Sequence, residues 1–177
     1  MCIRDSLDPL LSMILAACLA LVLAPAAWHK LRNRELFAAQ LQAYQILPRR
    51  LLALGHALAP LEAAAAIALL SGARMAGAAM AGSLLLLYAC AMALNLLRGR
   101  MLDCGCGGAP QPLSWGLVVR NLVLVLMALA AAAPQDAREL TMEDALLCGL
   151  AVPAWLVLLA ALNQVLRQGR SLRGAAH

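Results

Sequence analysis

The chain has 177 residues, of which 64% are hydrophobic and only 13% are charged. Soluble domains average about 45–50% apolar and roughly 25% charged residues, so this composition excludes an ordinary soluble protein and indicates an integral membrane protein. The formal net charge is +5, but the basic residues lie beside apolar runs, as the positive-inside rule expects. Nucleic acid is therefore not needed as a partner to explain the charge.

Five apolar runs approach the length of about 20 residues that a helix needs to cross ~30 Å of hydrocarbon. They predict an all-α, polytopic membrane helix bundle, with a four-helix core plus one further helix, that forms a single domain over residues 9–166. The expected spans are 9–28, 51–70, 75–97, 113–133 and 145–166, and a basic tail follows at 167–177.

The amino-terminal part contains a polar segment and the first span. Residues 1–8 form the polar segment, and the first six of them, Met1 to Ser6, resemble an adapter-derived start and are given no functional role. The first span is longer than a signal-peptide core of about 7–15 residues, and Trp28, His29 and Lys30 follow it in place of a cleavage site. We expect this span to be retained, with His29 and Lys30 as anchors that reach the membrane surface.

The loop at residues 29–50 is the most basic part of the chain. Within it Phe37, Leu41 and Tyr44 recur at i, i+4 and i+7, and Pro48 ends the pattern. This spacing predicts a short interfacial amphipathic helix after the first span. The following two spans are expected to form a close hairpin, because a Ser71-Gly72 turn separates them and small residues crowd the start of the later one: Ala76, Gly77, Ala78, Ala79, Ala81, Gly82 and Ser83.

Two cysteines lie one residue apart in a polar loop between the third and fourth spans, in the sequence Asp103-Cys104-Gly105-Cys106-Gly107. A disulfide within Cys-x-Cys needs a tightly folded backbone, which the glycines permit, and such a strained bridge exchanges readily. Arg98 and Arg100 would favour the thiolate forms, whereas Asp103 would oppose them. Redox exchange by Cys104 and Cys106 is the leading interpretation. Two others stay open, namely half of a tetrahedral metal site and a glycine turn with two idle cysteines, and no metal ligands are assigned.

Glu62 in the second span and Arg120 in the fourth are ionisable residues inside apolar runs, where charges are costly and usually meet a partner or a cavity. At ~1.5 Å per residue they lie roughly 18 Å and 12 Å from the same face of the membrane, so they could meet as an ion pair. The pair could lock the two spans together, or it could handle protons or bind a ligand. Asn121 is expected to act as interhelical glue, and Cys90 as a small buried hydrophobe.

The side of the membrane can be argued from the basic residues. Alternating spans place ten of them on the side that holds the basic loop and the cysteine loop, and three on the other side. The positive-inside rule then puts the amino terminus outside and the cysteine loop in the cytoplasm. If the orientation of the protein in the membrane is reversed, the basic loop and the cysteine loop still lie on the same side.

An ordered set of residues over about positions 10 to 135 resembles the methylamine utilisation protein MauE family, which is related to the DoxX-like membrane proteins. The set is His29-Lys30-Leu31, Phe37, Tyr44, Leu47-Pro48, Pro60-Leu61-Glu62, Arg98-Gly99, Asp103-Cys104-Gly105-Cys106-Gly107 and Arg120-Asn121. The resemblance implies an accessory redox protein of the bacterial inner membrane that works with a thioredoxin-fold partner in supplying or shuffling disulfides, with Cys104 and Cys106 as the matching thiols. Glu62, Arg120, Asn121, Lys30 and Asp103 are the expected supporting residues.

The resemblance and the charge count disagree on one point. In systems of that family the partner is periplasmic, which would place the cysteine loop outside, so the side stays open. The alternative function is a non-catalytic membrane scaffold or small-molecule carrier that uses a Glu62/Arg120 polar pocket. No cofactor is specified by the sequence; a quinone could accept electrons from the cysteine pair, although no stretch defines a quinone site.

Overall fold

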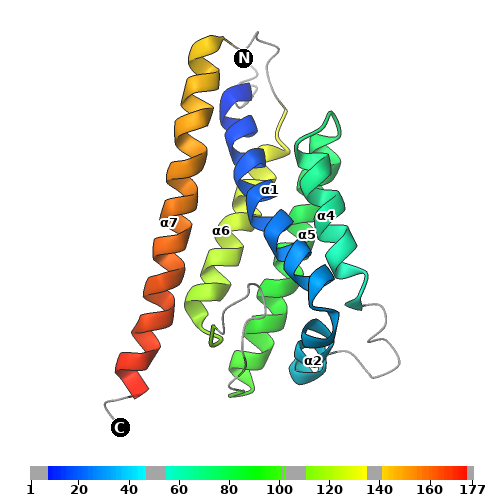
Figure 1. Cartoon of the computed structure of the whole chain (residues 1–177), viewed down its shortest axis with the longest axis vertical. Coiled ribbons are helices and arrows are strands. Elements are labelled where there is room, and N and C mark those ends of the chain that lie inside the picture. The colour runs from blue at the N-terminus through cyan, green and yellow to red at the C-terminus, as the bar shows by residue number, and fades with distance from the viewer. Residues whose placement is uncertain (1–7, 47–54, 101, 103–110, 135–140, 175–177) are drawn as a thin grey trace, which may run out of the picture.

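The structure is a computed structural model, and it describes residues 8–46, 55–100, 102, 111–134 and 141–174. In these residues the elements are α1 (Pro9–Arg32), α2 (Arg34–Tyr44), α4 (Leu58–Leu69), α5 (Arg74–Leu97), α6 (Trp115–Ala131) and α7 (Met142–Gly174). Figure 1 shows a bundle of roughly aligned long helices, with the short α2 at the end where α1 finishes. The predicted all-α membrane helix bundle is confirmed.

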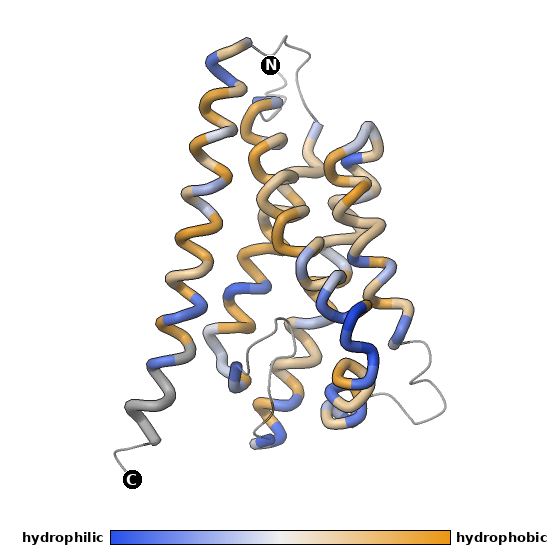
Figure 2. The backbone as a smooth tube through the Cα atoms, in the orientation of Figure 1, coloured by the Kyte–Doolittle hydropathy of each residue, from blue (hydrophilic) through white to orange (hydrophobic). Residues whose placement is uncertain are grey.

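The closest neighbours are α5 with α6, α1 with α4, and α4 with α5, while α7 stands at one side of the bundle against α1. Orange, hydrophobic residues cover most of each long helix in Figure 2, and hydrophilic residues gather at the end near α2. In the described part of the chain, three helices are long and apolar enough to cross a membrane: α1, α5 and the Met142–Leu166 part of α7. The helices α4 and α6 are also apolar but shorter.

The α1 helix begins where its sequence provides a start signal. The Asp8 side chain accepts a hydrogen bond from the Leu10 backbone N–H at 2.8 Å, and Pro9 occupies the first helical position, where its missing N–H costs nothing. The helix continues past the expected end of the first span to Arg32. That extension matters for the site, because it keeps Lys30 within the regular helix.

The core of the bundle is built largely from alanine and leucine on α1, α4, α5 and α6. A Cβ atom added at Gly77 would lie 2.5 Å from the Leu69 backbone nitrogen and 2.7 Å from the Ala68 carbonyl carbon. Only glycine therefore allows α5 to approach the end of α4 this closely, as expected for the predicted hairpin. The turn between the helices includes Ser71, whose hydroxyl donates to the Ala68 carbonyl at 3.0 Å.

Two further boundaries differ from the predictions. The described helix in the second apolar run begins at Leu58, and residues 47–54 lie outside the described part of the chain. The last helix continues to Gly174, through most of the segment expected as a basic tail. Hydropathy marked the apolar stretch, whereas Asn163, Gln164 and the arginines beyond it are compatible with helical backbone and simply extend the helix beyond its apolar part.

Candidate functional site

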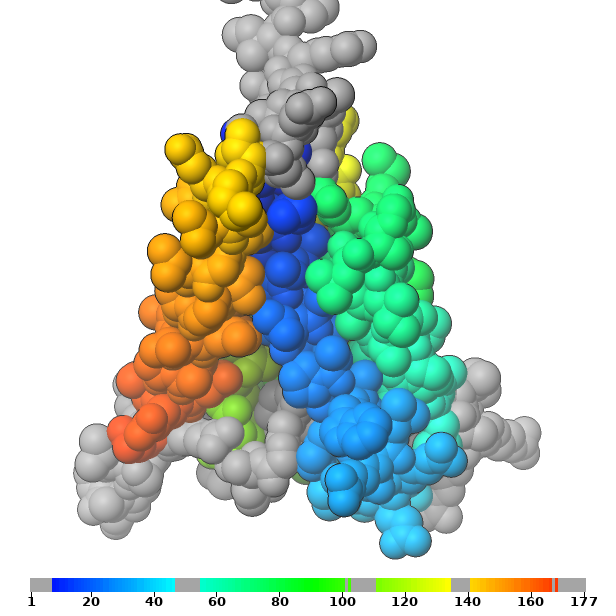
Figure 3. All heavy atoms as spheres, turned by 45° about the horizontal axis from the view of Figure 1, so that its top comes forward, coloured from blue at the N-terminus to red at the C-terminus, as the bar shows by residue number. Residues whose placement is uncertain are grey.

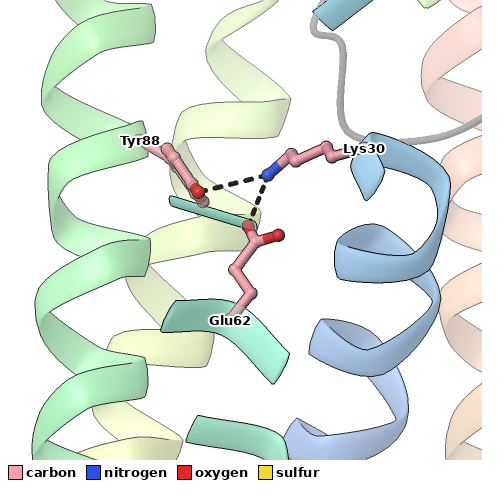
Figure 4. A network of polar contacts seen from close by, with 3 residues as sticks. All are labelled: Lys30, Glu62 and Tyr88. Carbon is pink, nitrogen blue, oxygen red and sulfur yellow. Dashed lines mark hydrogen bonds and ion pairs between the residues drawn. The ribbon is translucent and has the colours of Figure 1, made fainter. Parts of the chain in front are cut away.

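A buried ion pair joins α1 to α4 near the α2 end of the bundle. The Lys30 ammonium pairs with Glu62 Oε1, and the two residues are only 5% and 1% exposed. Lys30 Nζ also donates to the Tyr88 hydroxyl at 3.1 Å and lies 4.4 Å from the centroid of the Tyr88 ring. Figure 4 shows the three side chains converging from α1, α4 and α5. The network therefore ties three helices together through one ammonium group.

Helical periodicity explains why both charges point inward. Lys30 follows the buried Leu23 and Ala27 at spacings of seven and three residues, on the same face of α1. Glu62 likewise shares a face of α4 with the buried Ala59 and Ala66. Each charged residue lies on the core-facing stripe of its helix, so the bundle can assemble only with the two charges paired in its interior.

Two predictions are wrong at this point. Lys30 is not a surface anchor: it is buried, because α1 stays helical through Arg32 and turns this side chain toward the core. Glu62 does not pair with Arg120 either. Similar depth in the membrane made that ion pair plausible, but Lys30 reaches the Glu62 carboxylate from the neighbouring α1.

Arg120 instead connects α6 to α7. Its Nη1 atom donates to Asn163 Oδ1 at 2.8 Å. Asn121, the next residue, is buried, and its amide donates to the Leu117 carbonyl of its own helix at 3.2 Å and contacts Met92 Sδ of α5 at 4.0 Å. Its expected role as glue between helices is thus limited to a weak sulfur contact, while Arg120 provides a polar link to α7.

Glu62 and Arg120 nevertheless line the same cavity, which has a volume of about 280 Å³. Its polar side also includes Lys30, Tyr88, Gln111 and Asn163. Its apolar walls come mainly from α1 and α7, with one leucine each from α5 and α6. Three buried polar atoms on this lining have no hydrogen-bond partner among the described residues: Glu62 Oε2, Gln111 Nε2 and Arg120 Nε. A buried polar group without a partner is costly, so such a cluster is typical of a site that receives a ligand.

Asp103, Cys104 and Cys106 lie outside the described residues. The described ends of their segment meet, because the Leu113 backbone N–H donates to the Leu102 carbonyl at 2.8 Å, and Leu113 is fully buried. Before them, Arg100 Nη1 donates to the Tyr44 carbonyl at 3.5 Å, and its Nη2 donates to Gln45 Oε1. The ends of the basic loop and of the cysteine loop therefore lie together at the α2 end, in agreement with the charge pattern.

The three cysteines that the structure describes lie within helices and not in the Cys-Gly-Cys segment. Cys90 is exposed on α5, contrary to the prediction that it is buried, because the inward face of α5 at this level is taken by Ala89 and Met92. Cys18 is buried in α1, and Cys148 lies near the opposite end of the bundle in α7. Among the described residues, no group of three or more His, Cys, Asp or Glu side chains is placed to hold a metal ion.

Three residues of the polar site were not identified from the sequence: Tyr88, Gln111 and Asn163. Tyr88 and Asn163 are polar groups within predicted spans, so the rule that singled out Glu62 and Arg120 could have found them if it had been applied to uncharged residues. Gln111 sits between two prolines at the edge of the fourth run, where nothing in the pattern indicates that its side chain is buried.

The fold and the buried polar site together define a class: a polytopic membrane helix bundle with an internal ion pair and a polar cavity. Comparison with known proteins narrows the class further. The sequence model described as methylamine utilisation protein MauE matches residues 8–134, and this chain belongs to the MauE family. It is a member of a family of methylamine utilisation accessory proteins.

Individual relatives agree with this assignment. The chain is 42% identical over 133 residues to the methylamine utilization protein MauE of Paracoccus denitrificans, covering 71% of this chain and 70% of the relative. It is 40% identical over 146 residues to the MauE of Methylophilus methylotrophus, covering 78% and 77% respectively. No solved structure matches the chain. The family match ends before α7, so both charges of the ion pair lie within it and Asn163 lies beyond it.

Proposed function

We propose that this protein is an inner-membrane accessory protein that supports disulfide formation or exchange during maturation of a partner protein in methylamine utilisation. The names of its relatives support the link to methylamine utilisation. Cys104 and Cys106 are the exchanging thiols in this proposal, and a thioredoxin-fold protein is the partner. The Cys-Gly-Cys sequence supports the redox chemistry, because a strained disulfide between such close cysteines exchanges readily.

One observation carries the proposal: both described ends of the cysteine segment are fixed at one end of the bundle. The Leu113–Leu102 hydrogen bond closes the segment at its base, and Arg100 joins it to the end of α2. Cys104 and Cys106 therefore belong to a segment whose described flanking residues are attached to the bundle at its α2 end. This supports exchange with a partner protein that docks at that end.

The exchange step balances within the two proteins. In one direction a thiolate of the partner attacks the Cys104–Cys106 disulfide, and a mixed disulfide forms as one cysteine of this chain leaves as a thiolate. The partner's second thiolate then attacks the mixed disulfide. The partner gains a disulfide, and Cys104 and Cys106 gain two electrons and, on protonation, become thiols. The reverse sequence of steps oxidises this chain and reduces the partner.

Trapping of the mixed disulfide tests the proposal. Cys104→Ser and Cys106→Ser each leave one thiol that can attack a partner but not resolve the adduct. We expect one of the two variants to form a reducible adduct with a co-expressed thioredoxin-fold protein, and the double variant to form none. Cys90→Ser is the matched control, because Cys90 is exposed but lies within the helix α5 and not in the Cys-Gly-Cys sequence. Absence of any adduct, together with full partner maturation by the double variant, would contradict the proposal.

The same protein can be used to determine the side of the membrane. A membrane-impermeant maleimide, applied to intact spheroplasts before and after reduction, labels the loop only if its thiols are reduced and outside. The periplasmic partner implied by the family predicts labelling after reduction, whereas the excess of basic residues at this end predicts protection. Labelling in the Cys104→Ser, Cys106→Ser variant measures the background from other cysteines.

A second candidate function is a non-catalytic scaffold or small-molecule carrier. It is favoured by the cavity, since Glu62 and Arg120 both line it and three of its buried polar atoms have no partner among the described residues. This function predicts that Glu62→Gln impairs partner maturation while the Cys104→Ser, Cys106→Ser variant does not. Disulfide exchange predicts that the cysteine variant is inactive.

A further inference from the structure

The cavity opens toward the membrane between α1 and α7. Leu21 of α1 and Leu156 of α7 both line it, and these side chains are 41% and 37% exposed. Figure 3 shows that the blue α1 and the orange-red α7 diverge toward the α2 end, with α6 visible between them. In a bilayer this opening faces acyl chains. A ligand that enters here must therefore be dissolved in the membrane.

The inner part of the cavity has a different character. It holds two cationic side chains, Lys30 and Arg120, against the single carboxylate of Glu62, so one positive charge is left in excess. The buried Gln111 Nε2 and Arg120 Nε atoms are donors without a described partner. Donors and excess positive charge in a water-poor site favour a ligand with oxygen acceptors. The remaining orphan, Glu62 Oε2, can accept one hydrogen bond in return.

The volume of the cavity limits how much of a ligand it can enclose. The cavity measures about 280 Å³, below the range of ~300–1,000 Å³ for pockets that enclose a whole drug-sized ligand. It can hold a head group while the rest of the molecule extends through the opening into the bilayer. The apolar walls formed by Leu21, Val22, Leu156 and Leu159 suit the first carbons of such a tail.

We infer that this cavity binds the head group of a membrane-dissolved amphiphile through its oxygen acceptors, either the carbonyls of a quinone or the carboxylate of a fatty acid. The inference rests on the cavity of the second candidate function and names its ligand class. It does not require cysteine chemistry. A quinone ligand would be a second redox group in the same protein as the cysteine pair, but the proposed binding itself transfers no electrons.

Photolabelling of the full chain in phosphatidylcholine nanodiscs tests the inference. One arm uses a short-chain ubiquinone bearing an aryl azide, and the other uses a diazirine fatty acid. We expect one of the two probes to label α7 peptides around Leu156–Asn163 well above the lipid-facing side of α5 around Leu86 and Leu87, and the unlabelled parent compound to compete. The arm that succeeds identifies whether the head group is a quinone or a carboxylate.

Matched variants separate the cavity from general lipid contact. Ala160 lines the cavity and Ala161 does not, although both are exposed on α7. Ala160→Trp should lower specific labelling about tenfold by filling the cavity, and Ala161→Trp should leave it unchanged. Arg120→Gln, which retains a polar side chain but loses the charge, should lower it by a similar factor of about ten. The inference is overturned if neither probe exceeds the α5 background or if the two tryptophan variants behave alike.

The test is independent of the thiol experiments. Labelling is repeated in the Cys104→Ser, Cys106→Ser variant, where we expect no change. Specific labelling without any mixed disulfide would leave the inference standing and reject disulfide exchange. A mixed disulfide without specific labelling would reject the inference and leave disulfide exchange standing.

Discussion

The two halves of the bundle are built on different principles. The half around the α4–α5 turn, which we call the small-residue half, is packed from side chains such as Ala65, Ala78, Ala81, Ala128 and Ala131, with Gly77 at the tightest contact. The half near α2, the polar half, buries Lys30, Glu62 and Asn121 and contains the cavity. The polar half also holds the described ends of the cysteine segment.

This difference indicates that the small-residue half mainly stabilises the bundle and that the candidate functional site lies in the polar half. Close packing of small residues stabilises helices in lipid, where the hydrophobic effect does not hold helix against helix. Buried charges contribute little net stability compared with apolar residues of the same shape, but they are very costly when one partner is lost. The small-residue half is therefore expected to be sensitive to added volume, and the polar half to loss of either member of the Lys30–Glu62 pair.

Loss of one member of the ion pair should have the largest effect. Lys30→Met leaves the Glu62 carboxylate buried without its partner, and Glu62→Leu does the same to the ammonium of Lys30. We expect each single change to lower the free energy of unfolding by about 3–5 kcal/mol. Reversible unfolding in mixed detergent micelles, followed by helical circular dichroism, measures this loss.

The Lys30→Met, Glu62→Leu double variant tests whether the two buried charges are energetically coupled. With both charges replaced by apolar side chains of similar size, the loss should fall to less than about 1.5 kcal/mol, because no uncompensated charge remains. In this background Tyr88 loses its hydrogen bond and its ring contact with Lys30 but keeps its packing against the hydrophobic core. If the double variant is as unstable as the sum of the single variants, the pair is not coupled and the polar half is stabilised in some other way.

Added volume at the helix contact should have an intermediate effect. In Gly77→Ala the new methyl group would overlap the backbone of Ala68 and Leu69, so α4 and α5 must separate. We expect a loss of about 1–3 kcal/mol, measured as above. Gly82→Ala is the matched control on α5, since its Cβ would meet only Ala128 Cβ at 3.5 Å, an ordinary contact. Equal effects at the two glycines would show that helix propensity, and not packing, decides the outcome.

The sequence alone predicted the close helix packing of the small-residue half, but it predicted the contacts of the polar half only in part. Small residues at the start of the third run directly predict a close hairpin, because their effect depends on local composition. The partner of Glu62 depends on how α1 and α4 are rotated about their axes. Depth along the membrane normal put Glu62 and Arg120 at similar levels but contains no information on rotation, so it could not show that Lys30 would lie opposite Glu62.

The predicted length of the first helix was the second source of error. The prediction that Lys30 is an anchor assumed that the helix ends with the apolar run at Trp28, but backbone hydrogen bonding continues to Arg32. Helix ends are the least reliable part of such predictions, because polar residues with good helix propensity extend a helix at little cost. The Cys104/Cys106 pair could be recognised from its sequence alone, and it stays a prediction because it lies outside the described residues.

Loss of the link between α6 and α7 should have the smallest effect on overall stability. Asn163→Leu removes the acceptor of Arg120 Nη1, and Arg120 is partly exposed, so its guanidinium can find other partners. We expect a loss of about 0.5–1.5 kcal/mol in unfolding free energy.

Because α7 is mostly exposed and packs mainly on α1, the change should instead show as looser attachment of α7. Hydrogen exchange of α7 amides is expected to rise relative to those of α5. Gln164→Leu, at the next and exposed position, is the control and should leave the exchange unchanged, whereas equal exchange in both variants would show that the arginine does not hold α7 in place.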